Sequence, residues 1–328
     1  MAANVEWMVS GNRQVPWHGL GEVVDGLLNA DEMIVRSHLN YAVETWPVAA
    51  VSPITGEIMK FSDEHRATVR INGDGSTSVL SMVGSQYTPV QNKTLFDFAE
   101  ALTKVGGAKY ETAGVLDDGR KVWVLARLEA CDIVVMNKDQ LNSWLLLSNS
   151  HDASMAMTAA IVRVRVVCTN TLTRALNNAA NTFTIRHYQS VMEQVDAAKD
   201  ALGFAIDKSK EFQEMADALA RIPFTMPEMQ ELAVRVYPDH PEKKLASRGA
   251  MIARKELELV YELEGARTPE VASTAWAAYN AVAERADWRT SRVEGAARLN
   301  SIWYGSRSDV KERCLRELCD MKGLKYDG

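Results

Sequence analysis

Two arginines interrupt an apolar, β-branched run in the stretch IVRVRVVCTNTLTRAL, residues 161–176. If this run is a strand, Arg163 and Arg165 project from the same face, about 6.6–6.8 Å apart. A guanidinium group can bind phosphate through two parallel hydrogen bonds, so such a pair suits adjacent charges of a nucleic acid backbone. The opposite face is apolar and is expected in the core; it carries Val162, Val164, Val166 and Cys168.

The residues after this strand extend the candidate site. Thr169, Asn170 and Thr171 are good N-cap residues, and a helix is predicted to continue from Leu172 to Leu176. A helix N-terminus offers free backbone N–H groups and a partial positive charge, which suits phosphate. Together with Arg174 and Arg186, the two strand arginines would form a cationic track.

An alternative remains open for the strand arginines, because they could be solvated or paired with carboxylates of neighbouring strands. No Asp or Glu occurs between residues 153 and 192, so any such partner must come from a distant part of the chain. Trp123 and Trp144 lie on strands predicted in the same sheet and could stack on nucleic acid bases. The competing interpretation places both tryptophans in the core.

Catalytic chemistry is less well supported. Cys168 precedes the predicted helix start, where a thiol pKa is lowered, but it falls on the apolar face with three valines. A tight turn at Trp17 and His18 is the other candidate. The sequence contains no HExxH, GxSxG or paired-cysteine metal motif, so we assign no catalytic residue, metal ligand or cofactor and favour a binding protein over an enzyme.

The elements that must position these residues predict an α+β fold. Hairpins are expected over residues 67–83 and 110–128, with turns at Asn72–Gly75 and at Asp118–Gly119. A helix is expected over residues 92–107, and further strands over 143–150 and 158–168. Consecutive hairpins with an inserted helix predict a mostly antiparallel, hairpin-rich sheet backed by helices.

The character of the sequence changes near residue 188. A long helical pattern covers residues 187–222, and four further helical segments follow it. We therefore predict an α+β sheet domain over residues 1–189 and an all-helical C-terminal region over residues 190–328.

Composition limits the class of protein. Of the 328 residues, 47% are hydrophobic and 24% are charged, which is typical of a globular chain, and the net charge is −6. Four cysteines do not form a disulfide framework, the N-terminus does not resemble a signal peptide, and no apolar run is long enough to cross a bilayer. These features predict a cytoplasmic protein without a membrane partner.

Several motifs resemble those of a known family. WHGLG, VGSQYTPVQN, the YETAG and DDGRKVWVLA pair, LSNSHDAS, RVRVVCTNTL and TAWAAYNAVAERADW occur in this order. They resemble the phage/plasmid-like protein family gathered under domain of unknown function 932. The resemblance implies a protein encoded by bacteriophages or plasmids that works in the bacterial cytoplasm, and it brings no catalytic residues. The predicted architecture is also loosely similar to that of the Rad-type single-strand annealing proteins of phage recombination.

These observations lead to two hypotheses. The first is a phage- or plasmid-encoded protein that binds single-stranded DNA, or with less support RNA, for annealing or protection in recombination. A homo-oligomer is then expected, because one short cationic track makes few phosphate contacts. The second is a host-takeover or anti-defence protein that binds a bacterial protein. The first hypothesis requires the face carrying Arg163 and Arg165 to be open.

Overall fold

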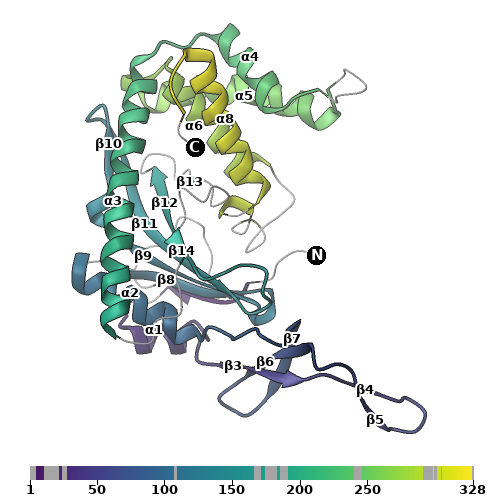
Figure 1. The fold of residues 1–328 in the computed structure, drawn as a ribbon. Coiled ribbons are helices and arrows are strands. Elements are labelled where there is room, and N and C mark those ends of the chain that lie inside the picture. The colour runs from purple at the N-terminus through teal and green to yellow at the C-terminus, as the bar shows by residue number, and fades with distance from the viewer. Residues whose placement is uncertain are drawn as a thin grey trace. The chain divides into compact units, whose positions relative to one another are not determined.

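The computed structural model describes residues 5–10, 22–23, 28–106, 109–165, 171–173, 183–184, 191–239, 246–290, 298, 301–303 and 305–326. These residues form antiparallel sheets in the N-terminal half and helices that lie mostly in the C-terminal half (Figure 1). The predicted α+β class is therefore confirmed.

The largest sheet has nine strands. Seven follow one another in the order β13-β12-β11-β9-β8-β1-β2, with β10 beside β11 and β14 beside β12. Pairing is antiparallel between β1 and β8, β8 and β9, β10 and β11, and β12 and β13, whereas β1 and β2 are parallel. The strands are β1 (Val5–Ser10), β2 (Glu22–Val23), β8 (Lys109–Leu116), β9 (Lys121–Arg127), β10 (Ile133–Val135), β11 (Asp139–Ser150), β12 (Thr158–Arg165), β13 (Thr171–Thr173) and β14 (Phe183–Thr184).

A three-stranded sheet and a separate hairpin, together residues 42–84, form what we call the arm (Figure 1). The sheet has the order β3-β6-β7, and β4 pairs only with β5 among the described strands. The hairpin predicted over residues 67–83 is confirmed, because β6 and β7 pair antiparallel. Asp74 and Ser76 close its turn through side-chain hydrogen bonds. The strands are β3 (Ala42–Pro47), β4 (Ala49–Val51), β5 (Ile58–Lys60), β6 (His65–Ile71) and β7 (Thr77–Gly84).

Two helices accompany the strands of the N-terminal half. In α1 (Ala30–Arg36), Asn29 caps the first turn and Glu32 bonds back to its N–H, so the start of this short helix is stabilised. The predicted helix α2 (Asn92–Gly106) is amphipathic and buries Leu95 and Phe98. It packs against β9, and α1 packs against β8, so helices cover this part of the sheet as expected.

The C-terminal helices share one hydrophobic core with β10 and the start of β11. Leu257, Trp276 and Leu318 are fully buried in it, together with Ile133 and Leu141 of the strands. The helical region therefore does not form a core of its own. Its helices are α3 (Val191–Arg221), α4 (Met226–Val236), α5 (Arg248–Arg267), α6 (Ala275–Glu284) and α8 (Ser306–Lys322).

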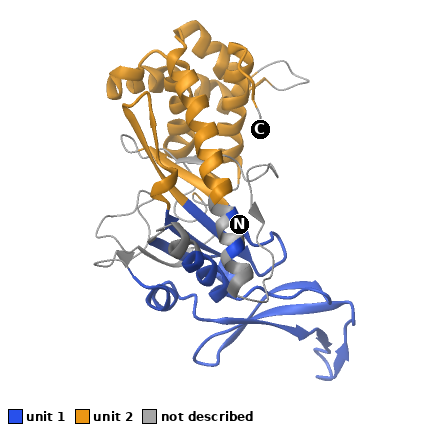
Figure 2. Cartoon of the chain, turned by 60° about the vertical axis from the view of Figure 1, so that its left-hand side comes forward, with its two compact units in different colours: residues 1–127, 145–159, 183–202 blue, residues 128–144, 160–182, 203–328 orange. Residues whose placement is uncertain are grey.

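The chain forms two compact units, and each consists of three separate segments of the sequence (Figure 2). Unit 1 contains residues 1–127, 145–159 and 183–202; unit 2 contains residues 128–144, 160–182 and 203–328. Both β11 and β12 contribute residues to both units. The predicted boundary near residue 189 does not coincide with this division.

One predicted element is wrong. Residues 171–173 form strand β13, whose Thr171 and Thr173 lie opposite Val164 and Val162 of β12. The chain therefore turns back to pair with β12 instead of starting a helix at Leu172. Ladder hydrogen bonds to a neighbouring strand satisfy the backbone groups that the capping pattern had assigned to a helix.

A buried arginine network replaces the candidate phosphate site

Both strand arginines are buried, which corrects the expectation that they face outward. Arg163 is 1% exposed and Arg165 is 0% exposed. Val162 and Val164 on the opposite face are buried as predicted. Strand β12 is therefore covered on both sides, and neither arginine can reach the phosphate backbone of a nucleic acid.

Arg165 is surrounded by acceptors from distant parts of unit 2. Its Nε donates to both carboxylate oxygens of Asp139, at 2.8 and 2.6 Å. Its Nη1 donates to Glu264, and its Nη2 donates to the hydroxyl of Thr268 at 2.9 Å. Trp276 Nε1 donates a further hydrogen bond to Asp139, at 2.8 Å. Each carboxylate is almost completely buried, so the three charges stabilise one another where water cannot.

Arg163 uses a different set of partners. Its Nη2 donates to Ser209 Oγ at 2.7 Å, and that hydroxyl donates in turn to the carbonyl of Ala205. Its guanidinium also lies over the ring of Phe212, 4.8 Å from the centroid, as in a cation–π contact. Helix α3 supplies all three residues and covers this part of β12.

The carboxylate partners come from positions that the local sequence does not connect to Arg165. Asp139 begins β11, and Glu264 lies in the last turns of α5. One pattern could have revealed Glu264, since it falls on the apolar stripe of α5 with Leu257, Val260 and Tyr261. A glutamate in such a stripe needs a buried cation, and the two arginines of β12 are candidates for it.

The other predicted contacts with nucleic acid are not assembled. Trp123 and Trp144 are buried, so the core interpretation of these tryptophans is correct. Thr171 lies in β13 and not at a helix start. Thr169, Asn170, Arg174 and Arg186 lie outside the described residues, as do Cys168, Trp17 and His18.

A polar cluster in unit 1 contains the histidine of LSNSHDAS. His151 is completely buried, and its Nε2 lies 2.9 Å from Asn92 Oδ1. Asn92 donates its own amide to the carbonyl of Leu39, so Oδ1 accepts and the histidine carries its proton on Nε2. The backbone N–H of His151 also donates to the backbone carbonyl of Arg120, at 2.7 Å. Burial lowers the pKa of His151 to about 4, and the ring is neutral at physiological pH.

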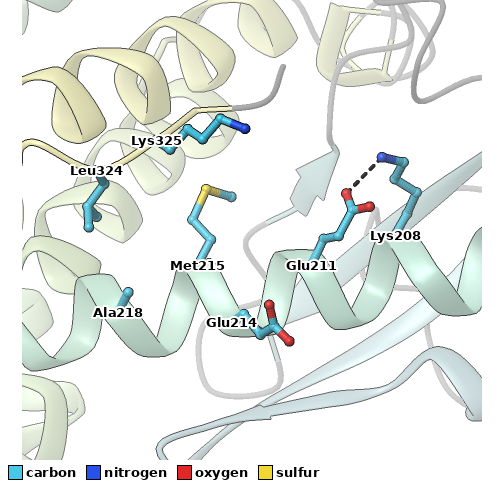
Figure 3. Close-up of a pocket in the computed structure, with 7 residues that line it drawn as sticks. All are labelled: Lys208, Glu211, Glu214, Met215, Ala218, Leu324 and Lys325. Carbon is cyan, nitrogen blue, oxygen red and sulfur yellow. Dashed lines mark hydrogen bonds and ion pairs between the residues drawn. The ribbon is translucent and has the colours of Figure 1, made fainter.

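A hollow of 380 Å³ lies beside α3 in unit 2 (Figure 3). Its lining combines two lysines and two glutamates with apolar side chains, and Lys208 pairs with Glu211 at 2.7 Å. No cysteine, serine or histidine lines it, so it offers no nucleophile–base pair of those types. The lining residues are Lys208, Glu211, Glu214, Met215, Ala218, Leu324 and Lys325.

Within the described ranges, no three His, Cys, Asp or Glu side chains gather in a way that could hold a metal ion. The helices in the described part of the chain are too short or too polar to cross a bilayer.

The fold and the network define an α+β protein whose sheet buries two arginines, of which Arg165 belongs to an ion-pair cluster. Residues 79–303 match the family model described as Domain of unknown function (DUF932), which is more than half of the chain. The chain belongs to this family. Arg165 and its partners all lie within the match, whereas β3–β6 of the arm precede it. Neither the curated proteins nor the solved structures gave a match.

Replacing Arg165 with alanine should destabilise the fold instead of weakening a surface contact. Arg165→Ala leaves Asp139 and Glu264 buried without their shared cation, which typically costs about 3–5 kcal/mol. Urea unfolding followed by circular dichroism measures this loss. Arg316→Ala is the control, because that side chain is 58% exposed and its removal should change stability by less than about 0.5 kcal/mol. Equal stability of the two variants would contradict a structural role for Arg165.

The buried His151 should make the protein less stable in mild acid. Between pH 6.5 and about 4 the unfolded chain binds a proton that the folded chain excludes, so the free energy of unfolding falls as pH falls through this window. The full loss is about 3 kcal/mol and is complete below the folded-state pKa. Urea unfolding at several pH values measures the slope. His151→Gln lacks the titrating ring and should show a shallower dependence; identical slopes would refute the assignment.

Proposed function

We propose that this chain is a phage- or plasmid-encoded protein of the bacterial cytoplasm that binds a protein of its host through the arm. The supporting observation is the apolar surface of residues 42–84. Eight of the seventeen large apolar side chains that are exposed among the described residues belong to this segment. They are Trp46, Val51, Ile54, Ile58, Met59, Phe61, Val79 and Met82.

The β4–β5 hairpin carries the most exposed of these residues. Ile54 at its turn is 93% exposed and Ile58 is 73% exposed. Val51 lies directly opposite Ile58, and Met59 lies opposite Ala50 on the other face. Both faces are therefore apolar and uncovered by the described chain. A two-stranded hairpin is marginally stable by itself, and contiguous exposed apolar surface is typical of protein interaction sites.

The adjoining sheet continues this surface. Trp46, Ala67 and Met82 form one row across β3, β6 and β7, and the two larger side chains are exposed. Aromatic residues and methionine are enriched where proteins contact each other. A partner that covers the hairpin could therefore also contact this row.

Single-stranded nucleic acid binding keeps less support. The residues that motivated it are buried, lie outside the described residues or, in the case of Thr171, lie in a strand instead of at a helix start. It stays a prediction, and a salt titration with a labelled single-stranded oligonucleotide tests it. Affinity that falls steeply with added salt would restore this hypothesis through residues other than Arg163 and Arg165, since counterion release marks phosphate contacts. Absence of binding at low salt would eliminate it.

A double substitution tests binding through the arm. Ile54→Ser/Ile58→Ser removes apolar surface without disturbing buried groups, so thermal stability should stay unchanged. The immobilised chain is incubated with bacterial lysate, and retained proteins are identified by mass spectrometry. The partner is then purified and its affinity measured. We expect the double variant to bind it at least about tenfold more weakly, as loss of a central apolar contact usually causes.

The matched control is Leu259→Ser/Leu263→Ser, which changes two exposed leucines of α5 and should retain the partner. A second copy of this chain is the alternative occupant of the arm. Light scattering of the purified chain measures its oligomeric state and so distinguishes self-association from binding of a host protein. If the purified partner binds the arm variant and the control equally well, or if only self-association depends on the arm, the proposed function is wrong.

A further inference from the structure

Three cations gather around Asp287 in unit 2. Lys311 is fully buried and donates to Asp287 Oδ1 at 3.0 Å. Arg298 donates through Nε to the backbone carbonyl of Asp287 at 2.9 Å, and Arg307 donates to the same carbonyl at 3.2 Å. Arg307 also donates to the carbonyl of Thr290, at 2.7 Å. The backbone carbonyl oxygen of Asp287 therefore accepts hydrogen bonds from two guanidinium groups, and its side chain accepts one from the ammonium group of Lys311.

Positive charge is concentrated in this cluster. Lys311 and Arg307 are buried, and Lys311 forms an ion pair with Asp287. Burial and the neighbouring Arg307 lower the pKa of Arg298. Burial also lowers the pKa of Arg307 and of Lys311, and Asp287 offsets this only in part. Cations that are held close together and are partly removed from water are stabilised when an anion binds to them.

Helix α8 adds further donors at the same place. It begins at Ser306, directly before Arg307, and its N-cap residue Gly305 has no side chain that could cap the first turn. The first helical hydrogen bond runs from Asp309 N to Gly305 O, so the N–H groups of the preceding residues are outside the helical ladder. This terminus carries a partial positive charge.

Two buried donors of this cluster form no hydrogen bond with the described residues. Ser308 is 1% exposed, lies in the first turn of α8, and its hydroxyl forms no hydrogen bond. The Nη2 group of Arg298 is also buried without an acceptor. Unsatisfied buried polar groups are costly, and they are common where a ligand completes the hydrogen bonding.

We propose that Arg298, Arg307, Ser308 and the N-terminus of α8 bind a phosphate group, with Lys311 supplying additional positive charge. The oxygens of a tetrahedral phosphate can accept directed hydrogen bonds from guanidinium, hydroxyl and helix N–H donors at the same time. A chloride ion cannot accept such directed hydrogen bonds. The ligand is inorganic phosphate or a phosphate monoester. Arg298 also lies 3.9 Å from the ring centroid of the part-exposed Trp288, which places an aromatic surface beside the site.

Isothermal titration of the full chain with inorganic phosphate tests this site, at constant ionic strength maintained with chloride. Wild type should bind phosphate and should unfold at a higher temperature in phosphate than in chloride. Arg298→Gln should weaken binding at least about tenfold, because charge-assisted hydrogen bonds to phosphate are strong. Ser308→Ala should weaken it about threefold to tenfold while leaving the unliganded protein equally or more stable, since it removes an unsatisfied hydroxyl.

Arg316→Ala is the matched control, because it removes an exposed arginine further along the same helix and should leave phosphate affinity unchanged. Adenosine monophosphate forms a second arm of the experiment. If adenosine monophosphate binds more tightly than inorganic phosphate, the site is assigned to a nucleotide. If the two bind equally well, it is assigned to free phosphate. An equal response to phosphate and chloride, or equal effects of Arg298→Gln and Arg316→Ala, would overturn the proposal. Unit 2 contains the whole site, so this outcome does not depend on the arm.

Discussion

Arg165 places a positive charge in the interior of unit 2, where it is stable only because carboxylate and hydroxyl groups surround it. Asp139 and Glu264 come from β11 and α5, and Thr268 follows the end of α5. Removing Arg165 would leave both carboxylates buried without the cation they share. The network therefore fixes which strand and which helix can pack against β12. Trp276 adds α6 to the same cluster through its hydrogen bond to Asp139.

The described residues satisfy their buried polar groups to different degrees. His151 keeps a neutral ring whose Nε2 bonds to Asn92, while its buried Nδ1 has no hydrogen-bond partner among the described residues. Around Asp287, two guanidinium groups and an ammonium group lie close together, and the Ser308 hydroxyl has no hydrogen-bond partner among the described residues. His151 is kept neutral and offers no charge to a ligand, whereas the cations around Asp287 supply the positive charge that the proposed phosphate site needs.

The sequence predicted most elements of the fold because their signals are local. The turns at Asn72–Gly75 and Asp118–Gly119, the amphipathic helix α2 and the C-terminal helices were all predicted from residues that are close in the chain. The helix expected from Leu172 was wrong, since pairing with β12 outweighed the capping pattern. The alternation along β12 correctly placed Val162 and Val164 in the core, but it could not show that the other face is also covered.

The sequence alone thus determined the class of fold, the faces of the strands and the absence of acidic residues near Arg163 and Arg165. Only the tertiary structure decided what those arginines contact. Asp139 is 26 residues before Arg165 and Glu264 is 99 residues after it, so no local pattern connects them. A charge can be buried when any part of the chain supplies its counterion, and that choice is made by packing between distant elements rather than by neighbours in the sequence.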